Sequence, residues 1–429
     1  MKKVLIITYY WPPGSGPGVQ RFLKFSKYLR DYGWEPLILT VKNGTYPNQD
    51  ESLINDIPNG VKVFKTKTFE PFSLYSLLTG KKTNSKLSGS IGLSNKSLVQ
   101  RLFLYIRANF FIPDARKGWN SYALKKAQQI IKDEGIDAII TTGPPHSTHL
   151  IGKKLKKWFQ LPWIADFRDP WTTVFYNSIF PRSMATKRQD KKLEDIVLNE
   201  ADMVTVVSKG MFDEFSDRAT SICTIYNGFD EADFVHKTPI RPEKFVISHV
   251  GNFYDSQNVE CLWRCIRDLT EENDSFKSHL QLNFVGNVHH EVIDSIEAFG
   301  LSSYVTQKGF LSHDKAIEQM MSSATLLFLI PKSENNHLII TGKLFEYLAS
   351  SKPILAIGPS GNASVILSES ERGIMMAYDN YGYMKQQILS HYKGWLENTS
   401  FTKNTDKINQ FSRKKLTELL AKQLDSISK

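Results

Sequence analysis

A chain of 429 residues is too long for one ordinary hydrophobic core, so two domains are expected. Its 41% hydrophobic and 23% charged residues are typical of a globular protein and exclude a disordered or low-complexity majority. Three cysteines give no disulfide framework and no zinc spacing, and no run reaches the roughly 18 apolar residues of a membrane span.

The net charge of +10 is concentrated in the first half of the chain. Residues 1–230 contain 33 Lys and Arg against 21 Asp and Glu, which is +12, so the remaining residues contribute −2. Eight of these basic residues and one acid lie between residues 71 and 118. No nucleic-acid-binding motif accompanies them, so we expect no nucleic acid partner. The cysteine usage predicts a cytoplasmic protein. The charge excess predicts contact with an anionic membrane surface, with peripheral attachment at the inner face of the cell membrane.

The first part of the chain alternates between strand and helix patterns. The apolar run at residues 3–8 predicts a buried strand rather than a signal peptide, and a Gly-rich turn and a helix at 20–32 follow it. Later strands are predicted at 36–41, 137–142, 163–166 and 203–208, with helices at 121–134, 148–159 and 191–200. This alternation predicts a parallel sheet in a Rossmann-like domain of residues 1–228.

Residues 69–117 interrupt this alternation and are poor in strand patterns. Within them, LVQRLFLYIRANFF at 98–111 predicts a cationic amphipathic helix. Its arginines either face solvent on a packed helix or contact a membrane surface.

A second alternating series begins at residues 245–250. Further strands are predicted at 281–285, 325–330 and 353–357, with helices at 315–322 and 342–350. This series predicts a second Rossmann-like domain of residues 229–405. A last helix at 406–429 is expected to pack back on the first domain.

Glycines and a lysine mark two loops suited to phosphate. Gly14, Gly16 and Gly18 precede the first helix, where glycine lets a ligand approach the backbone near the positive helix end. Their spacing departs from G-x-G-x-x-G, which disfavours a nicotinamide site and leaves a structural turn as the alternative. Gly342 and Lys343 open a later helix that can receive a diphosphate, with an ordinary helix cap as the alternative.

Polar residues also follow two first-domain strands. His146 and His149 lie on a loop between a strand and a helix, and Asp166 and Arg168 end another strand. Open α/β sheets bind ligands at such strand ends, so the Asp166 carboxylate is a candidate to orient an acceptor hydroxyl or to accept its proton. The alternatives are structural histidines and a buried Arg–Asp pair.

Six segments taken together resemble the retaining, GT-B-fold glycosyltransferases of family 4, particularly the bacterial surface-polysaccharide type. They occur in the family's order over nearly the whole chain: VLIITYYWPPGSGPGVQR, TTGPPHSTHLIG, WIADFRDPW, ADMVTVVSKG, IYNGFDEADF and TGKLFEYLASSKPILAI. The resemblance implies two Rossmann-like domains facing each other across a cleft. It further implies a nucleotide-sugar donor on the second domain and a saccharide or lipid-linked acceptor on the first.

The resemblance also implies roles for single residues. Glu346 matches the family's ribose-binding glutamate, Gly342 and Lys343 match its diphosphate-facing helix start, and Gly251 matches the glycine after the first strand of the second domain. The glycines at 16 and 18 match the loop beneath the donor phosphates, and the histidine at 146 matches the one that contacts the transferred sugar, with that at 149 as the reserve.

The chain departs from the family pattern at two places. The position eight residues before Glu346 is Leu338 rather than a glutamate, and no cation follows Gly251. The diphosphate charge must then be met by Lys343, with Lys332 as the second choice.

We therefore expect a glycosyltransferase that moves a sugar with retention at the anomeric carbon, in surface-polysaccharide synthesis. No Asp-x-Asp motif lies in a suitably placed loop, so we expect no metal and no cofactor besides the nucleotide-sugar substrate. The alternatives are a nucleotide-sugar epimerase of the same fold and a non-catalytic family member that acts as a binding subunit.

Overall fold

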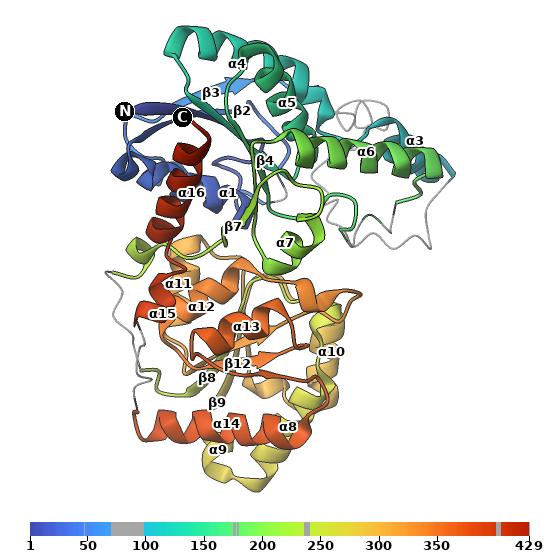
Figure 1. The fold of residues 1–429 in the computed structure, drawn as a ribbon. Helices are drawn as coiled ribbons and strands as arrows, with labels where there is room; N and C mark the ends of the chain where they lie inside the picture. The colour runs from blue at the N-terminus through green and yellow to red at the C-terminus, as the bar shows by residue number, and fades with distance from the viewer. Residues whose placement is uncertain are drawn as a thin grey trace. The chain divides into compact units, whose positions relative to one another are not determined.

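The computed structural model describes residues 1–46, 48–69, 98–174, 177, 180–235, 241–399 and 405–428, without the side chains of 98–103 and 405. The chain divides into two compact units (Figure 1), one of residues 1–226 and 416–429 and the other of residues 227–415. Each unit is built around its own parallel sheet.

The first unit has seven strands in the order β3-β2-β1-β4-β5-β6-β7. Because β1 leads to β2 on one side and β4 leads to β5 on the other, the carboxyl ends of β1 and β4 form a topological switch point, where open α/β sheets bind ligands. The strands are β1 (Lys2–Ile7), β2 (Trp34–Val41), β3 (Lys62–Thr66), β4 (Ala138–Gly143), β5 (Trp163–Phe167), β6 (Met203–Val206) and β7 (Ile222–Thr224).

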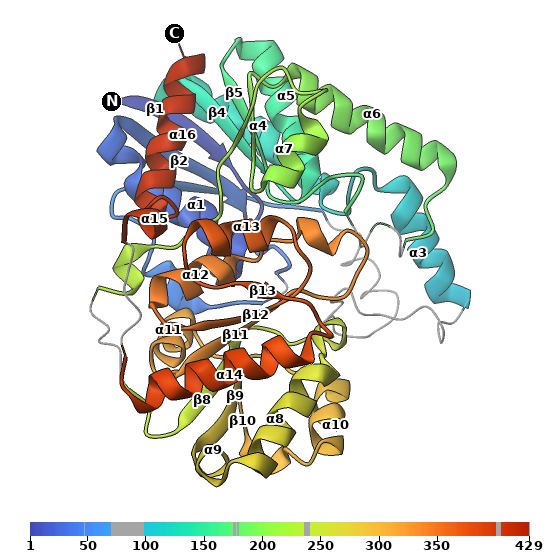
Figure 2. The ribbon, with the colours of Figure 1, turned by 60° about the horizontal axis from the view of Figure 1, so that its bottom comes forward.

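Successive side chains of a strand point to opposite faces of the sheet, and the inner strands are apolar at both sets of positions. Both faces are therefore apolar, and helices cover both. In β1, Val4 and Ile6 pack in one core with α1 and α16, whereas Leu5 and Ile7 pack in the other with α4 and α5. Figures 1 and 2 both show α16 beside α1. The helices are α1 (Pro17–Tyr28), α3 (Leu98–Phe110), α4 (Asn120–Glu134), α5 (His149–Phe159), α6 (Met184–Glu200), α7 (Lys209–Phe215) and α16 (Arg413–Ile427).

The second unit has six strands in the order β10-β9-β8-β11-β12-β13, with its switch point between β8 and β11. The strands are β8 (Phe245–Val250), β9 (Leu280–Val285), β10 (Val305–Gly309), β11 (Thr325–Leu329), β12 (Ile354–Ile357) and β13 (Met375–Met376). The helices are α8 (Glu260–Glu272), α9 (Asp274–His279), α10 (His290–Ala298), α11 (His313–Met321), α12 (Gly342–Ser350), α13 (Asn362–Glu369), α14 (Tyr381–Leu396) and α15 (Thr405–Asn409).

The two Rossmann-like sheets confirm the predicted fold class. The tail predicted as one helix is two, α15 and α16, and the chain passes from the second unit to the first at Leu416, within α16. No helix in the described part of the chain is both long and apolar enough to cross a membrane.

Candidate active site

The second unit brings Lys343 and Gly251 together at the carboxyl end of β8. A Cβ at Gly251 would lie 2.8 Å from the Lys343 Nζ atom, and the φ of 117° at Gly251 also favours glycine. Helix α12 begins next to Thr341, whose side chain makes no capping hydrogen bond and whose buried Oγ1 has no partner among the described residues. An ammonium and the free N–H groups of a helix start therefore converge, which suits an anion.

His249, near the end of β8, holds this ammonium. The Nζ atom of Lys343 lies 3.2 Å from Nε2 of His249, whose Nδ1 lies 3.1 Å from the Leu327 carbonyl oxygen. A carbonyl only accepts, so Nδ1 carries the proton in the tautomer in which Nε2 accepts from Lys343; the Asn252 carbonyl oxygen also lies 3.3 Å from Nε2. Burial lowers the pKa of His249 to about 3, so the ring is neutral. Lys343 forms no ion pair with a described carboxylate, and Glu346 acts on it only from beyond ion-pair distance, so its charge is available to a ligand.

Glu346 lies one turn further along α12, with its side chain 25% exposed. His313 contacts it: Nδ1 of His313 is 3.9 Å from Oε1 of Glu346, and Nε2 is 3.1 Å from Oδ2 of Asp233. Burial raises the pKa of Glu346, while His313 acts in the opposite direction. A partly exposed carboxylate at this position can accept hydrogen bonds from two vicinal hydroxyls.

In the first unit, the guanidinium of Arg168 lies against the first turn of α1. Its Nε donates to the Gly143 carbonyl at 3.2 Å, and its Nη2 donates to the carbonyl of Pro144. A Cβ at Gly18 would overlap Nη1, so only glycine leaves this space to the guanidinium. Gly16 is the N-cap of α1 and offers no side chain to its free N–H groups. The cation and the helix start meet at the switch point of this sheet, which again suits an anion.

Two histidines border Gly143 at the end of β4. A Cβ at Gly143 would lie 2.9 Å from Nδ1 of His146 and 2.6 Å from Nε2 of His149. His149 is fully buried, with Nδ1 2.9 Å from the Thr141 hydroxyl. His146 stacks on Trp171 with ring centroids 5.0 Å apart. Neither ring nitrogen of His146 forms a hydrogen bond of good distance and angle with a described residue.

The charge of His146 limits its chemistry. Burial, together with the nearby Arg168, lowers the pKa of His146 to about 3, although a contact with the Pro170 carbonyl acts in the opposite direction. The ring is therefore neutral near pH 7. It can offer hydrogen bonds to a ligand, but it cannot serve as a strong general acid.

Asp166 belongs to the protein framework rather than to the ligand-facing group. It is fully buried and accepts hydrogen bonds from Arg21 at 2.6 Å, from Thr142 at 2.8 Å and from Thr205 at 2.7 Å. The alternative of a buried Arg–Asp pair is therefore what the structure shows, with Arg21 as the partner instead of Arg168. This pair joins α1 to β5.

A cavity of about 120 Å³ lies beside His146 in the first unit. Trp171 lines it and donates its Nε1–H to Asp190 at 2.7 Å, and Asp114 lines it and accepts from the Ser147 backbone at 2.8 Å. Stacked rings beside fixed polar groups suit a hydroxylated ligand.

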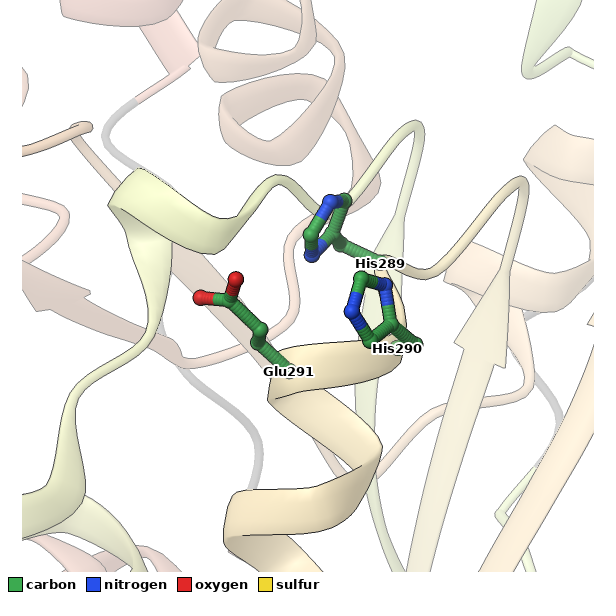
Figure 3. Close-up of side chains that lie close together, drawn as sticks. All are labelled: His289, His290 and Glu291. Carbon is green, nitrogen blue, oxygen red and sulfur yellow. The ribbon is translucent and has the colours of Figure 1, made fainter. Parts of the chain in front are cut away.

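One group of described residues has side chains placed to share a metal ion: His289, His290 and Glu291 (Figure 3). Their ligand atoms lie within 4.8 Å of one another. The last two are exposed, and all three lie at the start of α10, where the helix dipole disfavours a cation. We assign no function to this group.

Sequence reasoning did not select His249 or His313. The only sequence feature that could have indicated His249 is that it is a polar residue near the end of an apolar strand. His313 and Glu346 are far apart in the sequence and come together only when α11 and α12 pack. Lys332, the second choice for the diphosphate, is exposed, and its Nζ lies 5.3 Å from the centre of the Tyr378 ring.

Comparison with known proteins adds two family matches. Residues 92–233 match the family model described as Glycosyltransferase Family 4, and residues 230–408 match the one described as Glycosyl transferases group 1. No curated protein sequence matches the chain.

Solved structures share the fold at low sequence identity. Anabaena HepE in complex with UDP-glucose has a TM-score of 0.61 at 15% identity, covering 99% of this chain and 100% of HepE. A variant of S. aureus TarM with fondaparinux, α-GlcNAc-glycerol and UDP has a TM-score of 0.58 at 11% identity, covering 99% and 100%. A putative UDP-N-acetylglucosamine 2-epimerase from Listeria monocytogenes has a TM-score of 0.52 at 12% identity, covering 99% and 96%.

Two Rossmann-like units, each with cationic and helix-start groups at its switch point, define a two-domain protein of the GT-B class. The two family matches run through residues 92–408, and both describe glycosyltransferases. The chain is therefore a GT-B glycosyltransferase.

Proposed function

We propose that this enzyme transfers a sugar from a nucleotide diphosphate donor to a saccharide or lipid-linked acceptor, with retention, in surface-polysaccharide synthesis. The observation that carries the proposal is the position of the Lys343 ammonium beside Gly251. This ammonium contacts the neutral imidazole of His249 and forms no ion pair with a described carboxylate. A site with unneutralised positive charge and free helix N–H groups suits a diphosphate.

The second domain binds the donor in this proposal. Lys343 and the start of α12 receive the diphosphate, and the unpaired Thr341 hydroxyl can add one more hydrogen bond. Glu346 accepts from the ribose hydroxyls. These groups stabilise the negative charge that grows on the leaving diphosphate, so catalysis is mainly electrostatic and positional.

The first domain handles the transferred sugar and the acceptor. Arg168 beside Gly18 gives the first domain its own cation for an anionic group of a ligand. No Asp-x-Asp motif lies in a suitably placed loop, so we propose no metal requirement. Neutral His146 offers a hydrogen bond to the sugar, and the cavity beside it accommodates acceptor hydroxyls. Asp166 takes no part, because its oxygens are committed to Arg21 and two threonines.

Thermal stabilisation by a panel of nucleotide sugars tests the donor site, because a ligand that binds only the folded state raises the melting temperature. We expect one member to stabilise the protein and the Glu346→Ala variant to lose most of that shift while it melts at the wild-type temperature without ligand. Unchanged donor affinity in Glu346→Ala would sink the ribose assignment. The anomeric configuration of the product, read by NMR, tests retention.

Two other functions remain as rivals. The Listeria 2-epimerase shares the fold, so an epimerase is one of them; conversion of the donor without any acceptor would favour it. A non-catalytic binding subunit is the other, because no cation follows Gly251. Absence of donor binding in calorimetry would favour that function.

We also propose that the first domain attaches to an anionic membrane surface from the cytoplasmic side. The charge excess of residues 1–230 supports this location. Helix α3 adds three exposed apolar side chains, Tyr105, Ile106 and Phe110. Attachment would bring the acceptor-handling domain to a lipid-linked substrate.

A further inference from the structure

Three ionisable side chains from three separate elements meet around Glu346 in the second unit. Asp233 ends the 3-10 helix η6 (Glu231–Asp233), His313 is the first residue of α11, and Glu346 lies within α12. The side chains are 15%, 18% and 25% exposed, respectively, so water screens their interaction only in part.

Each nitrogen of the His313 ring faces a carboxylate. Nε2 lies 3.1 Å from Oδ2 of Asp233, and Nδ1 lies 3.9 Å from Oε1 of Glu346. A neutral imidazole has one N–H, so it can donate a hydrogen bond to only one of two ionised carboxylates. An imidazolium has two N–H groups and a positive charge, so it stabilises both. The geometry therefore couples the ionisation of Glu346 to the charge of His313.

The surroundings of Glu346 oppose its ionisation, which makes this coupling matter. Burial raises the pKa of Glu346, and Asp233 raises it further. His313 lowers it, with an Nδ1 atom 3.9 Å from the carboxylate, and Arg413 and Lys343 act in the same direction. The N-terminus of α11 disfavours a positive charge on His313, whereas the carboxylates of Asp233 and Glu346 favour it.

The charge of Glu346 decides how it meets a ribose. Vicinal hydroxyls are donors, and an ionised carboxylate can accept from both in strong, charge-assisted bonds. A protonated acid keeps one of its oxygens as a donor and loses that double acceptance.

We propose that His313, held between Asp233 and Glu346, is a positioning residue that keeps Glu346 ionised so that it accepts both ribose hydroxyls of the donor. The inference rests on the proposed function, because it takes Glu346 as the ribose ligand. Donor binding then fails at a higher pH when the charge of His313 is removed.

The test is the dissociation constant of UDP-glucose and of GDP-mannose, measured by calorimetry from about pH 5 to about pH 7.5. A nucleotide sugar serves better than a free nucleoside diphosphate, because its diphosphate does not gain a proton in this range. In the wild type, affinity falls as decreasing pH protonates Glu346. His313→Gln retains a hydrogen-bond donor for Asp233. In this variant we expect the donor affinity to fall about one pH unit higher than in the wild type, and to lie within about twofold of the wild-type affinity near pH 7.5.

Two variants separate charge from structure. His313→Arg retains a positive charge and should restore the wild-type profile, and Lys315→Gln, which removes an exposed charge from the same helix, should leave it unchanged. If the pH dependence of donor affinity in His313→Gln is the same as in the wild type, the inference is overturned. It is also overturned if the affinity is lower by the same factor at every pH. In both cases the proposed donor binding is unaffected. If neither nucleotide sugar binds the wild-type protein, the proposed function fails and the inference fails with it.

Discussion

The ammonium of Lys343 is hydrogen-bonded to the neutral imidazole of His249 at 3.2 Å instead of to a carboxylate. A carboxylate partner would cancel the charge that a diphosphate needs, whereas an imidazole orients the ammonium and leaves that charge intact. Burial also lowers the pKa of Lys343 to about 8, although Glu346 acts in the opposite direction.

The first prediction follows from this pKa. Lys343 is charged below about pH 8 and neutral above it, so donor affinity should fall as the pH rises through that value. Lys343→Arg should abolish this alkaline fall, because a guanidinium stays charged. Lys343→Ala should lower turnover by about 10²-fold or more, the cost of removing one group that stabilises developing charge. Steady-state kinetics from about pH 7 to about pH 9.5 measure both effects.

Lys332→Ala is the matched control for Lys343→Ala, because its side chain is exposed and lies over the Tyr378 ring. Near-normal turnover in Lys343→Ala, with a large loss in Lys332→Ala, would transfer the diphosphate role to Lys332.

The second prediction concerns Gly18. A Cβ there overlaps the Arg168 guanidinium, which is the mobile end of a long side chain, so Gly18→Ala should displace Arg168 without unfolding the domain. We expect turnover to fall at least about tenfold, with a melting temperature within a few degrees of the wild type. Gly382→Ala is the control, since its added Cβ meets no atom within 4 Å and lies in helix α14. Wild-type turnover in Gly18→Ala would remove Arg168 from the site.

The strands that sequence patterns identified, and those that they missed, differ in their place in the sheet. All inner strands, such as β1, β4, β8 and β11, were predicted, because strands covered on both faces are continuous apolar runs. All four edge strands, β3, β7, β10 and β13, were missed. The sequence of β10, VTQKG, shows why: only its first residue is apolar and its last three residues are exposed, so it has no apolar run to detect.

The candidate site shows the same limit in another form. Gly251 and Lys343 were each chosen from a local motif, yet their contact, and the place of His249 beneath the lysine, arise only when β8 and α12 pack together. Local pattern also placed Asp166 at a strand end but did not reveal its partner, because Arg21 lies 145 residues earlier in the chain.

The third prediction tests the framework role of Asp166. Asp166→Asn leaves the fully buried Arg21 guanidinium without a counter-charge, so the first unit should lose about 3–5 kcal/mol of its free energy of unfolding. Hydrogen exchange of residues 138–167 reports on that unit alone. Lys209→Gln, which breaks the exposed pair with Asp213, should cost at most about 1 kcal/mol. A small loss in Asp166→Asn, accompanied by a large loss of turnover, would instead return Asp166 to the catalytic groups.

The last prediction concerns the membrane surface, and the structure changes which variants test it. Arg101 and Arg107 are the two arginines of the cationic segment at 98–111, so charge reversal at both would test lipid contact from the sequence alone. However, the guanidinium of Arg107 lies over the Phe180 ring at 5.1 Å, so reversing this charge would disturb packing as well as lipid contact. The side chain of Arg101 lies outside the described residues, as do Lys81, Lys82, Lys86 and Lys96.

The sharper variants are therefore Arg101→Glu for charge and Phe110→Ser for apolar contact, since the Phe110 residue is 70% exposed at the end of α3. About 1 kcal/mol per basic residue near an anionic leaflet, over three contacts, corresponds to roughly 10²-fold in partitioning. We expect sedimentation with phosphatidylglycerol vesicles at low salt, little with phosphatidylcholine alone, and release at high salt. Both variants should weaken binding, whereas Lys393→Gln, an exposed charge on α14 of the other unit, should not. Binding that is absent at low salt, or that ignores lipid charge and both variants, would show that the basic residues form only a solvated face.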